Sequence, residues 1–187
     1  DKPTHAEVFG PNPEFMYMAF RCGGYKSEDM KYLTMIDYIF SSGGKAGLID
    51  LDLVNKQKVL YAGSDVDFMN DYGYQMFFAS PKQGQSLDEL KELLLKEIEK
   101  IKNGDFGEWQ LTAIVNDIRL QKIKAMETNQ ISKQFVSSFI HNYSWEEYLN
   151  FENELSKITK TDLIEFAKKF FKNNYVTVYK RYGVDSN

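Results

Sequence analysis

KVLYAGSDVDFMNDYGYQMFFAS, residues 58–80, decides the fold class of this chain. Residues 58–64 and 72–80 have the composition of β-strands, and the polar segment 65–71 between them suits a turn. Two strands joined by so short a connection pair in antiparallel fashion. The stretch therefore predicts a β-hairpin and, with it, a mainly antiparallel sheet.

Three more strands are expected on either side of this hairpin. Residues 6–9 end at a turn-forming Gly-Pro-Asn-Pro segment. Residues 15–22 (FMYMAFRC) form a nearly continuous apolar run, which predicts a central strand covered on both faces. Residues 175–179 (YVTVY) return to strand composition near the end of the chain.

Helices are expected in most of the remaining sequence. Helical spacing of apolar residues covers 27–40, 48–54, 86–103 and 108–140, with a break near 128–129, and two further helices follow. Three helix starts carry capping boxes, in which two residues satisfy each other's unpaired backbone donors. These pairs are Ser86 with Glu89, Ser144 with Glu147, and Thr159 with Asp162. On the first of the helices, Asp37 is a polar exception on the face that should pack on the core.

The order of elements is strands, helix, hairpin, several helices and a final strand. This order predicts an α+β fold with a mainly antiparallel sheet and helices packed on one face. No low-complexity linker or repeat divides the sequence, so residues 1–187 are expected to form one domain.

Composition excludes several classes of partner. The formal net charge is -4, and 20 of the 23 basic residues are lysines, so the arginine clusters that recognise nucleic acid are missing. No apolar run approaches the roughly 18 residues that span a bilayer, so membrane insertion is not expected. Cys22 is the only cysteine and lies in an apolar strand, which predicts a buried small hydrophobe.

The sequence lacks the residues of a hydrolytic zinc site. Such a site needs about three protein ligands, usually with two imidazoles, and the two histidines here, His5 and His141, stand far apart in the sequence. The glycine-rich segment 41–47 does not match a phosphate-binding loop, because Ala46 follows Lys45 where serine or threonine is required. No metal or other cofactor is therefore expected in this chain.

Three aspartates in the predicted turn suggest a calcium loop at first sight. They are Asp65, Asp67 and Asp71. The expected pattern would place a third oxygen ligand at Met69 and a glycine at Asn70, so a solvated turn is the preferred interpretation.

Four segments carry a resemblance to a known family. They are residues 4–21, the glycine-rich loop with its following helix and strand (43–64), the paired helices from 86 onward, and residues 156–179. In this order they resemble the non-catalytic repeat domain of the insulinase/pitrilysin-type zinc peptidases. The resemblance covers about residues 3–182.

The resemblance also indicates which functions to expect. Catalytic domains of the family carry His-x-x-Glu-His on an early helix, and the corresponding helix here reads LTMIDYIF (33–40). Partner domains supply an arginine and a tyrosine to the substrate, and this chain has Val54 and Tyr61 at those positions. Candidate substrate-binding residues are therefore Tyr61, Gly43 and Gly44, although Tyr61 also suits packing on a strand face.

The resemblance implies a clamshell enzyme in which repeated α+β domains enclose extended or unfolded peptides. This chain would form one non-catalytic wall, its partners being other domains of the same polypeptide and the peptide substrate. Zinc would lie in another domain of that metallopeptidase, in a periplasmic or secreted setting. Two alternatives remain open: an inactive scaffold subunit of the same superfamily, and an unrelated α+β carrier of a small ligand.

Overall fold

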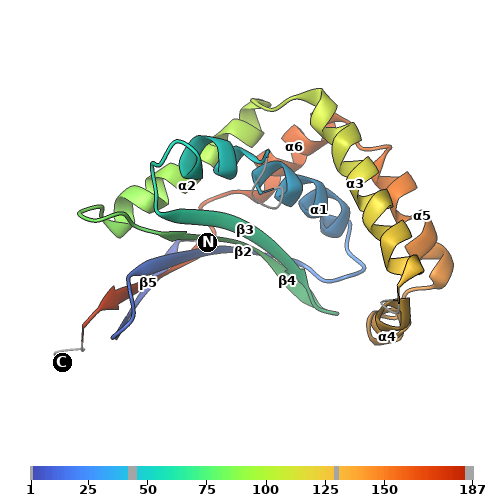
Figure 1. The fold of residues 1–187 in the computed structure, drawn as a ribbon, viewed down its shortest axis with the longest axis horizontal. Helices are drawn as coiled ribbons and strands as arrows, with labels where there is room; N and C mark the ends of the chain where they lie inside the picture. Colours follow the sequence, from blue (N-terminus) through green and yellow to red (C-terminus); the bar gives the residue numbers. More distant parts are fainter. Residues whose placement is uncertain (1, 42–45, 129–130, 184–187) are drawn as a thin grey trace.

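The computed structural model describes residues 2–41, 46–128 and 131–183, and five strands form its sheet (Figure 1). The strands are β1 (Thr4–Gly10), β2 (Phe15–Gly23), β3 (Tyr61–Phe68), β4 (Tyr72–Ser80) and β5 (Tyr175–Tyr182). Their order across the sheet is β1-β5-β2-β4-β3. Three of the four neighbouring pairs are antiparallel, and β1 with β5 is the parallel exception. The predicted mainly antiparallel α+β fold is confirmed.

The helices lie on one face of the sheet (Figure 1). They are α1 (Asp29–Phe40), the π-helix η1 (Asp50–Val54), α2 (Leu87–Asn103), α3 (Glu108–Glu127), α4 (Ile131–His141), α5 (Trp145–Leu155) and α6 (Lys160–Phe170). Within the described ranges, every helix is too short or too polar to cross a lipid bilayer.

The core lies between the helices and the inner face of the sheet. On β2, Met16, Met18 and Phe20 are buried and alternate with exposed or half-buried residues such as Tyr17. Burial on alternate residues means that β2 is covered on one face only. The expectation that this strand would be covered on both faces was wrong, because its outer residues, most of them apolar, are not packed beneath a second layer.

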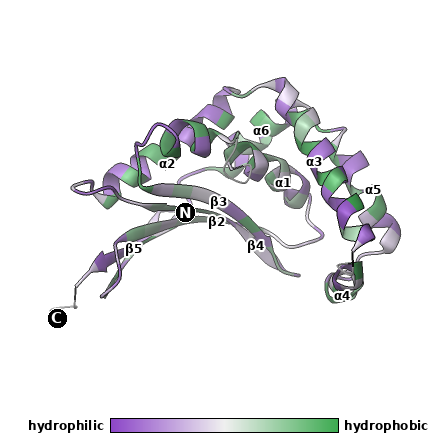
Figure 2. Cartoon of the chain, viewed as in Figure 1, coloured by the Kyte–Doolittle hydropathy of each residue, from purple (hydrophilic) through white to green (hydrophobic). Residues whose placement is uncertain are grey.

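Local signals fixed the helix termini as expected. The Ser86 hydroxyl accepts a hydrogen bond from the backbone N–H of Glu89 at 3.2 Å, and the Glu89 carboxylate accepts one from the N–H of Ser86 at 2.8 Å. Gly104 ends α2 at φ 75°, in the left-handed region that glycine tolerates. Both hydrophobic and hydrophilic stretches are visible along α2 in Figure 2. The boxes that begin α5 and α6 are also present.

The hairpin is tighter than the sequence suggested. Strand β3 extends to Phe68, and the backbone N–H of Met69 donates to the carbonyl of Tyr72 at 2.9 Å, which closes a two-residue turn. Asp65 and Asp67 therefore lie in a strand and not in a loop that could wrap around calcium.

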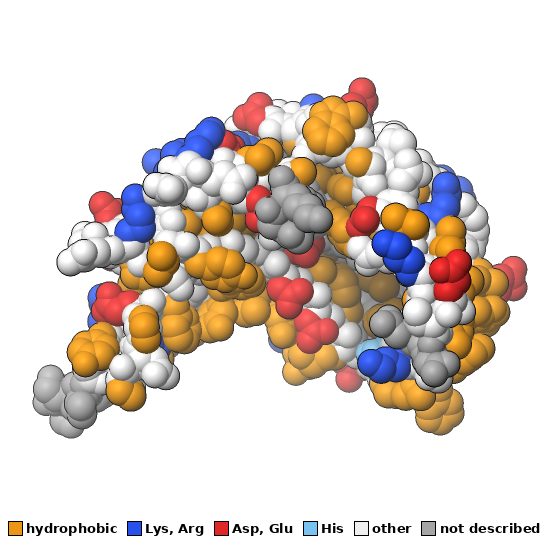
Figure 3. Space-filling view, viewed as in Figure 1, with side chains coloured by type: hydrophobic (Ala, Val, Ile, Leu, Met, Phe, Trp, Pro, Cys, Tyr) orange, Lys and Arg blue, Asp and Glu red, His pale blue; other side chains and the backbone are white. Residues whose placement is uncertain are grey.

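Helices α3, α4 and α5 form one end of the molecule. Figure 1 shows α3 beside α5, with α4 beyond them. None of the residues of α4, all of which the structure describes, is buried. Figure 3 shows hydrophobic side chains gathered at this end, and Phe139 on α4 is 88% exposed. The position of α4 therefore depends on individual side-chain contacts, such as the stacking of Phe135 on Trp145, more than on burial.

Candidate functional site

The predicted site residue Tyr61 is the first residue of β3, one of the two edge strands of the sheet. Its side chain is 56% exposed and stacks on Phe78, with the ring centroids 5.7 Å apart. The Phe78 ring also lies over Gly63, where an added Cβ would approach it to 2.7 Å. Tyr61 thus packs along one side and is open to solvent on the other. The other two predicted residues, Gly43 and Gly44, lie outside the described residues.

The edge of the sheet beside Tyr61 is a second feature of this region. Among the described residues, β4 is the only strand that pairs with β3. Because Met69 and Tyr72 form a hydrogen-bonded pair, alternate residues of β3 direct their backbone groups away from β4. Those residues are Ala62, Ser64, Val66 and Phe68. The edge is therefore a row of backbone donors and acceptors without a strand partner in the described part of the chain.

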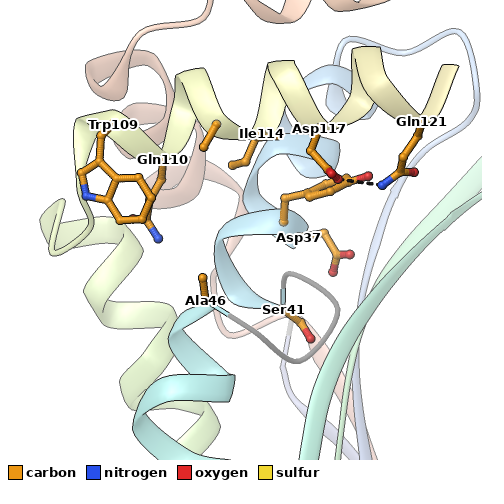
Figure 4. A pocket seen from close by; sticks show the side chains of 10 residues that line it. Asp37, Ser41, Ala46, Trp109, Gln110, Ile114, Asp117 and Gln121 are labelled. Carbon is orange, nitrogen blue, oxygen red and sulfur yellow. Dashed lines mark hydrogen bonds between the residues drawn. The ribbon is translucent and has the colours of Figure 1, made fainter. Parts of the chain in front are cut away.

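A pocket of about 640 Å³ lies between α1 and α3 (Figure 4). Two carboxylates, two aromatic side chains and several small or apolar residues line it. The lining residues are Asp37, Tyr38, Ser41, Ala46, Trp109, Gln110, Ala113, Ile114, Asp117 and Gln121. The pocket is thus assembled from two helices and from the ends of the segment that connects α1 to η1.

Asp37 is the most unusual residue of this pocket. Its carboxylate accepts a hydrogen bond from Gln75 Nε2 at 2.8 Å, and the same amide donates to the Asp65 carbonyl at 3.2 Å. Burial raises the pKa of Asp37 from its ordinary 3.8 to about 6, and the nearby charge of Asp65 acts in the same direction. The hydrogen bond from Gln75 opposes this rise without cancelling it.

A second carboxylate faces the same pocket from α3. Gln121 Nε2 donates to Asp117 Oδ2 at 2.6 Å, as the dashed line in Figure 4 shows. The pKa of the Tyr38 hydroxyl is raised by burial first and then by the charges of Asp117 and Asp37. Two carboxylates of the pocket therefore lie close enough to the Tyr38 hydroxyl to act on its pKa.

Sequence reasoning found one of these residues and missed the others. Asp37 carried a signal, a carboxylate on the core-facing side of a helix. Asp117 and Trp109 carried none, because each is an exposed residue of α3 that lines the pocket without being buried. Asp37 is the polar residue on the core-facing side of α1, and α1 is the helix on which the catalytic domains of the family would carry their zinc motif.

The histidines lie apart from this pocket and from each other. His5 is on β1, where its Nδ1 lies 3.0 Å from Thr177 Oγ1, and His141 ends α4, where its Nδ1 lies 2.8 Å from Asn70 Oδ1. In residues 2–41, 46–128 and 131–183 no group of three histidine, cysteine or acidic side chains could hold a metal ion. Cys22 is buried, as expected, and burial raises the pKa of its thiol to about 12.

Comparison with known proteins supports the fold assignment. No protein-family model and no curated protein sequence matches the chain. A protease from Helicobacter pylori has a similar structure, with a TM-score of 0.88 and 18% identity over 97% of this chain and 45% of that chain. A peptidase M16 inactive domain from Pseudomonas fluorescens gives a TM-score of 0.79 and 17% identity over 100% of this chain and 45% of that chain.

A third structure matches over almost its whole length. The inactive peptidase domain of a proposed zinc protease from Bordetella parapertussis gives a TM-score of 0.78 and 13% identity, over 95% of this chain and 97% of that chain. This chain thus spans less than half the length of the first two structures and nearly all of the third. The predicted resemblance is confirmed at the level of the fold: this chain has the α+β fold of the insulinase-type (M16) peptidase domains, including the inactive ones.

Proposed function

We propose that this chain is a non-catalytic domain of a longer insulinase-type metallopeptidase and forms part of a chamber that encloses extended peptides. The observation that carries the proposal is the edge of β3. It belongs to a fold shared with inactive peptidase domains, and in the described residues it has no strand on its outer side.

An unpaired strand edge suits an extended peptide for a simple chemical reason. Such a peptide has the same alternation of backbone donors and acceptors, so it can add as a further strand. Edge strands that serve no partner are usually protected by charge, and β3 carries Asp65 and Asp67 on its exposed positions. These two charges protect the edge against self-association and still leave its backbone groups available.

Tyr61 would contact the side chain of such a peptide at the start of the edge. Its ring is held by Phe78 on one side, and its other side is exposed. A held aromatic ring loses little conformational freedom on binding, which favours its use in recognition. Gly43 and Gly44 remain proposed contacts of the same peptide.

The remaining expectations of the resemblance belong to the same proposal. Residues 1–187 would act as one domain, whose partners are other domains of the same polypeptide. A zinc ion in one of those domains would perform the hydrolysis, in a periplasmic or secreted setting. This chain would form one wall of the chamber and would bind the enclosed peptide.

Fluorescence anisotropy with a fluorescein-labelled unstructured peptide tests the role of the edge. We expect the 187-residue chain to bind the peptide. Ser64→Pro should weaken binding at least tenfold, because it removes a backbone N–H that points away from β4 and leaves the β3–β4 pairing intact. Tyr61→Ala should weaken binding roughly three- to tenfold, through loss of one aromatic contact.

The matched control is Tyr182→Ala, which removes a tyrosine that is 70% exposed on β5, away from β3. It should bind like the unmodified chain. Circular dichroism and thermal melting verify that each variant is folded. Two results would refute this role for the edge. One is that the unmodified chain does not bind the peptide. The other is that the folded Ser64→Pro and Tyr61→Ala variants both bind the peptide as tightly as the unmodified chain.

A further inference from the structure

We propose that the exposed side of α4 docks on the outer face of the sheet in a second copy of this chain, and that the second copy returns the same contact. The outer face is the side of the sheet away from the helices (Figure 1). This inference does not depend on peptide binding at the β3 edge, since it uses side chains of the sheet face and not the backbone groups of the edge.

Helix α4 has the reverse of the usual pattern of a surface helix. Its large apolar side chains recur at helical spacing on one side, and each is at least 54% exposed. They are Phe135, Val136, Phe139 and Ile140. The polar residues Gln134 and His141 face the protein instead: Gln134 Nε2 donates a hydrogen bond to the Tyr143 hydroxyl, and His141 stacks on Tyr25. The apolar side of α4 is therefore the side without a protein layer over it in the described ranges.

The outer face of the sheet is apolar as well. Tyr17 of β2 lies between Phe78 of β4 and Val178 of β5, and the next row of side chains is built in the same way. That row consists of Met76, Ala19 and Val176. Within the described residues, no helix lies over this face (Figure 1), and Tyr17 is 38% exposed. An antiparallel sheet that meets water on one face normally carries polar residues there, so this composition indicates a covered face.

A second copy of this chain supplies what each surface lacks. An apolar helix side and an apolar sheet face are the two layers from which α+β cores are built. In a two-fold arrangement each contact is made twice, so one pair of chains covers both surfaces in both copies and closes on itself. A lipid surface would cover α4 and leave the outer face of the sheet open.

The charges beside the two surfaces have opposite signs. Lys133, which is exposed, is the only lysine, arginine, aspartate or glutamate of α4. On the sheet, Asp65 and Asp67 of β3 are exposed and lie in register with Met76 and Tyr74 of β4. With Lys133 directed toward β3 of the second copy, the contact places opposite charges at its rim, where such pairs favour the correct orientation.

Sedimentation velocity over a concentration series, on the 187-residue chain at neutral pH and physiological ionic strength, tests the proposal. We expect a monomer–dimer equilibrium. Phe139→Glu on α4 and Val176→Glu on the outer face should each weaken dimerisation at least tenfold, because each places a carboxylate in an apolar contact. The matched control is Leu51→Glu on η1, where Leu51 is 44% exposed and Val176 is 45% exposed. This variant should dimerise like the unmodified chain.

An equal mixture of the two variants tests the helix-on-sheet geometry. A mixed pair has one contact between an unmodified α4 and an unmodified outer face, so the mixture should dimerise more strongly than either variant alone. A dimer formed by α4 against α4 would persist in Val176→Glu, and that result would overturn the proposal. Circular dichroism verifies folding, and Tyr17→Glu replaces Val176→Glu if the latter does not fold.

Three further results would overturn the proposal. The unmodified chain stays monomeric, the Leu51→Glu variant loses as much affinity as the other two, or the assemblies keep growing beyond a dimer. A monomeric chain that co-sediments with phosphatidylcholine vesicles, and loses this binding in Phe139→Glu, would assign α4 to a lipid surface instead.

Discussion

Asp37 illustrates how a single residue can depart from the pattern of its helix. Its neighbours Leu33, Ile36 and Phe40 are buried as the helical spacing predicted, and Asp37 shares their side of α1. The structure accommodates the carboxylate by a hydrogen bond from Gln75 on β4 and by partial access to the pocket. Burial nevertheless disfavours its charge, so the pKa of Asp37 rises to about 6.

This pKa shift predicts a dependence of stability on pH. The folded-state pKa of about 6 lies above the ordinary 3.8, so the stabilising contribution of Asp37 is complete below pH 4 and is lost as pH rises through 6. Asp65 of β3 contributes to the same shift. Asp37→Asn, which cannot ionise, should therefore increase the free energy of unfolding at pH 8 by roughly 1–3 kcal/mol.

Urea denaturation at pH 4 and pH 8 measures this effect. The advantage of Asp37→Asn should shrink or vanish at pH 4, and Asp71→Asn should show no such difference between the two pH values. If the Asp37→Asn variant is no more stable than the unmodified chain at pH 8, burial of the charged Asp37 carboxylate does not destabilise the fold, and the prediction is wrong.

At the scale of elements, the C-terminal end of α4 contacts two loops on the sheet side of the molecule. The ring of Tyr25 is stacked between His141 and Tyr143, with centroid distances of 4.3 and 4.9 Å. Asn70, in the turn of the hairpin, donates a hydrogen bond from Nδ2 to the carbonyl of Ile140 at 3.1 Å. These contacts tie α4 to the connection between β2 and α1 and to the β3–β4 turn.

Tyr25→Ala should loosen α4 without unfolding the core. The variant loses two aromatic stacks, each of about 0.5–1.5 kcal/mol, and α4 itself contributes no buried residue within the described ranges. We expect amide hydrogen exchange in residues 131–141 to accelerate about tenfold, with the exchange of β2 and β4 unchanged. Tyr182→Ala is the control and should leave α4 unaffected. Unchanged exchange in α4 of the Tyr25→Ala variant would show that other contacts hold this helix.

The elements that could be predicted from sequence are those with local causes. The starts of α2, α5 and α6 were predicted because a capping box joins residues only three positions apart. The end of β3 was misplaced because its aspartates resemble turn residues, while their alternation with Val66 and Phe68 also fits a strand. The segment 48–54 was expected to be helical, and its π-helical geometry at Asp50–Val54 had no signal in the spacing.

At the scale of the whole molecule, the fold class was predictable and the strand order was not. Hairpins are local, but β1 lies beside β5 through pairs such as Thr4 with Val176, which are far apart in the sequence. The pocket has the same origin, since residues of α1 and α3 come to line it together only after α3 packs on α1. The predicted contact Tyr61 could be named from the family resemblance alone, and its role remains a prediction.

The central proposal is that this chain is a non-catalytic domain that binds peptide without hydrolysing it. Its two histidines belong to distant parts of the fold, and the helix where the family's zinc motif would stand carries Leu33, Ile36 and Asp37 instead. The most direct measurement is zinc content after equilibration with excess zinc and desalting, read beside cleavage of a quenched fluorescent peptide. We predict far less than one zinc per chain and no cleavage that a chelator abolishes. One tightly held zinc per chain, together with chelator-sensitive cleavage, would contradict the account.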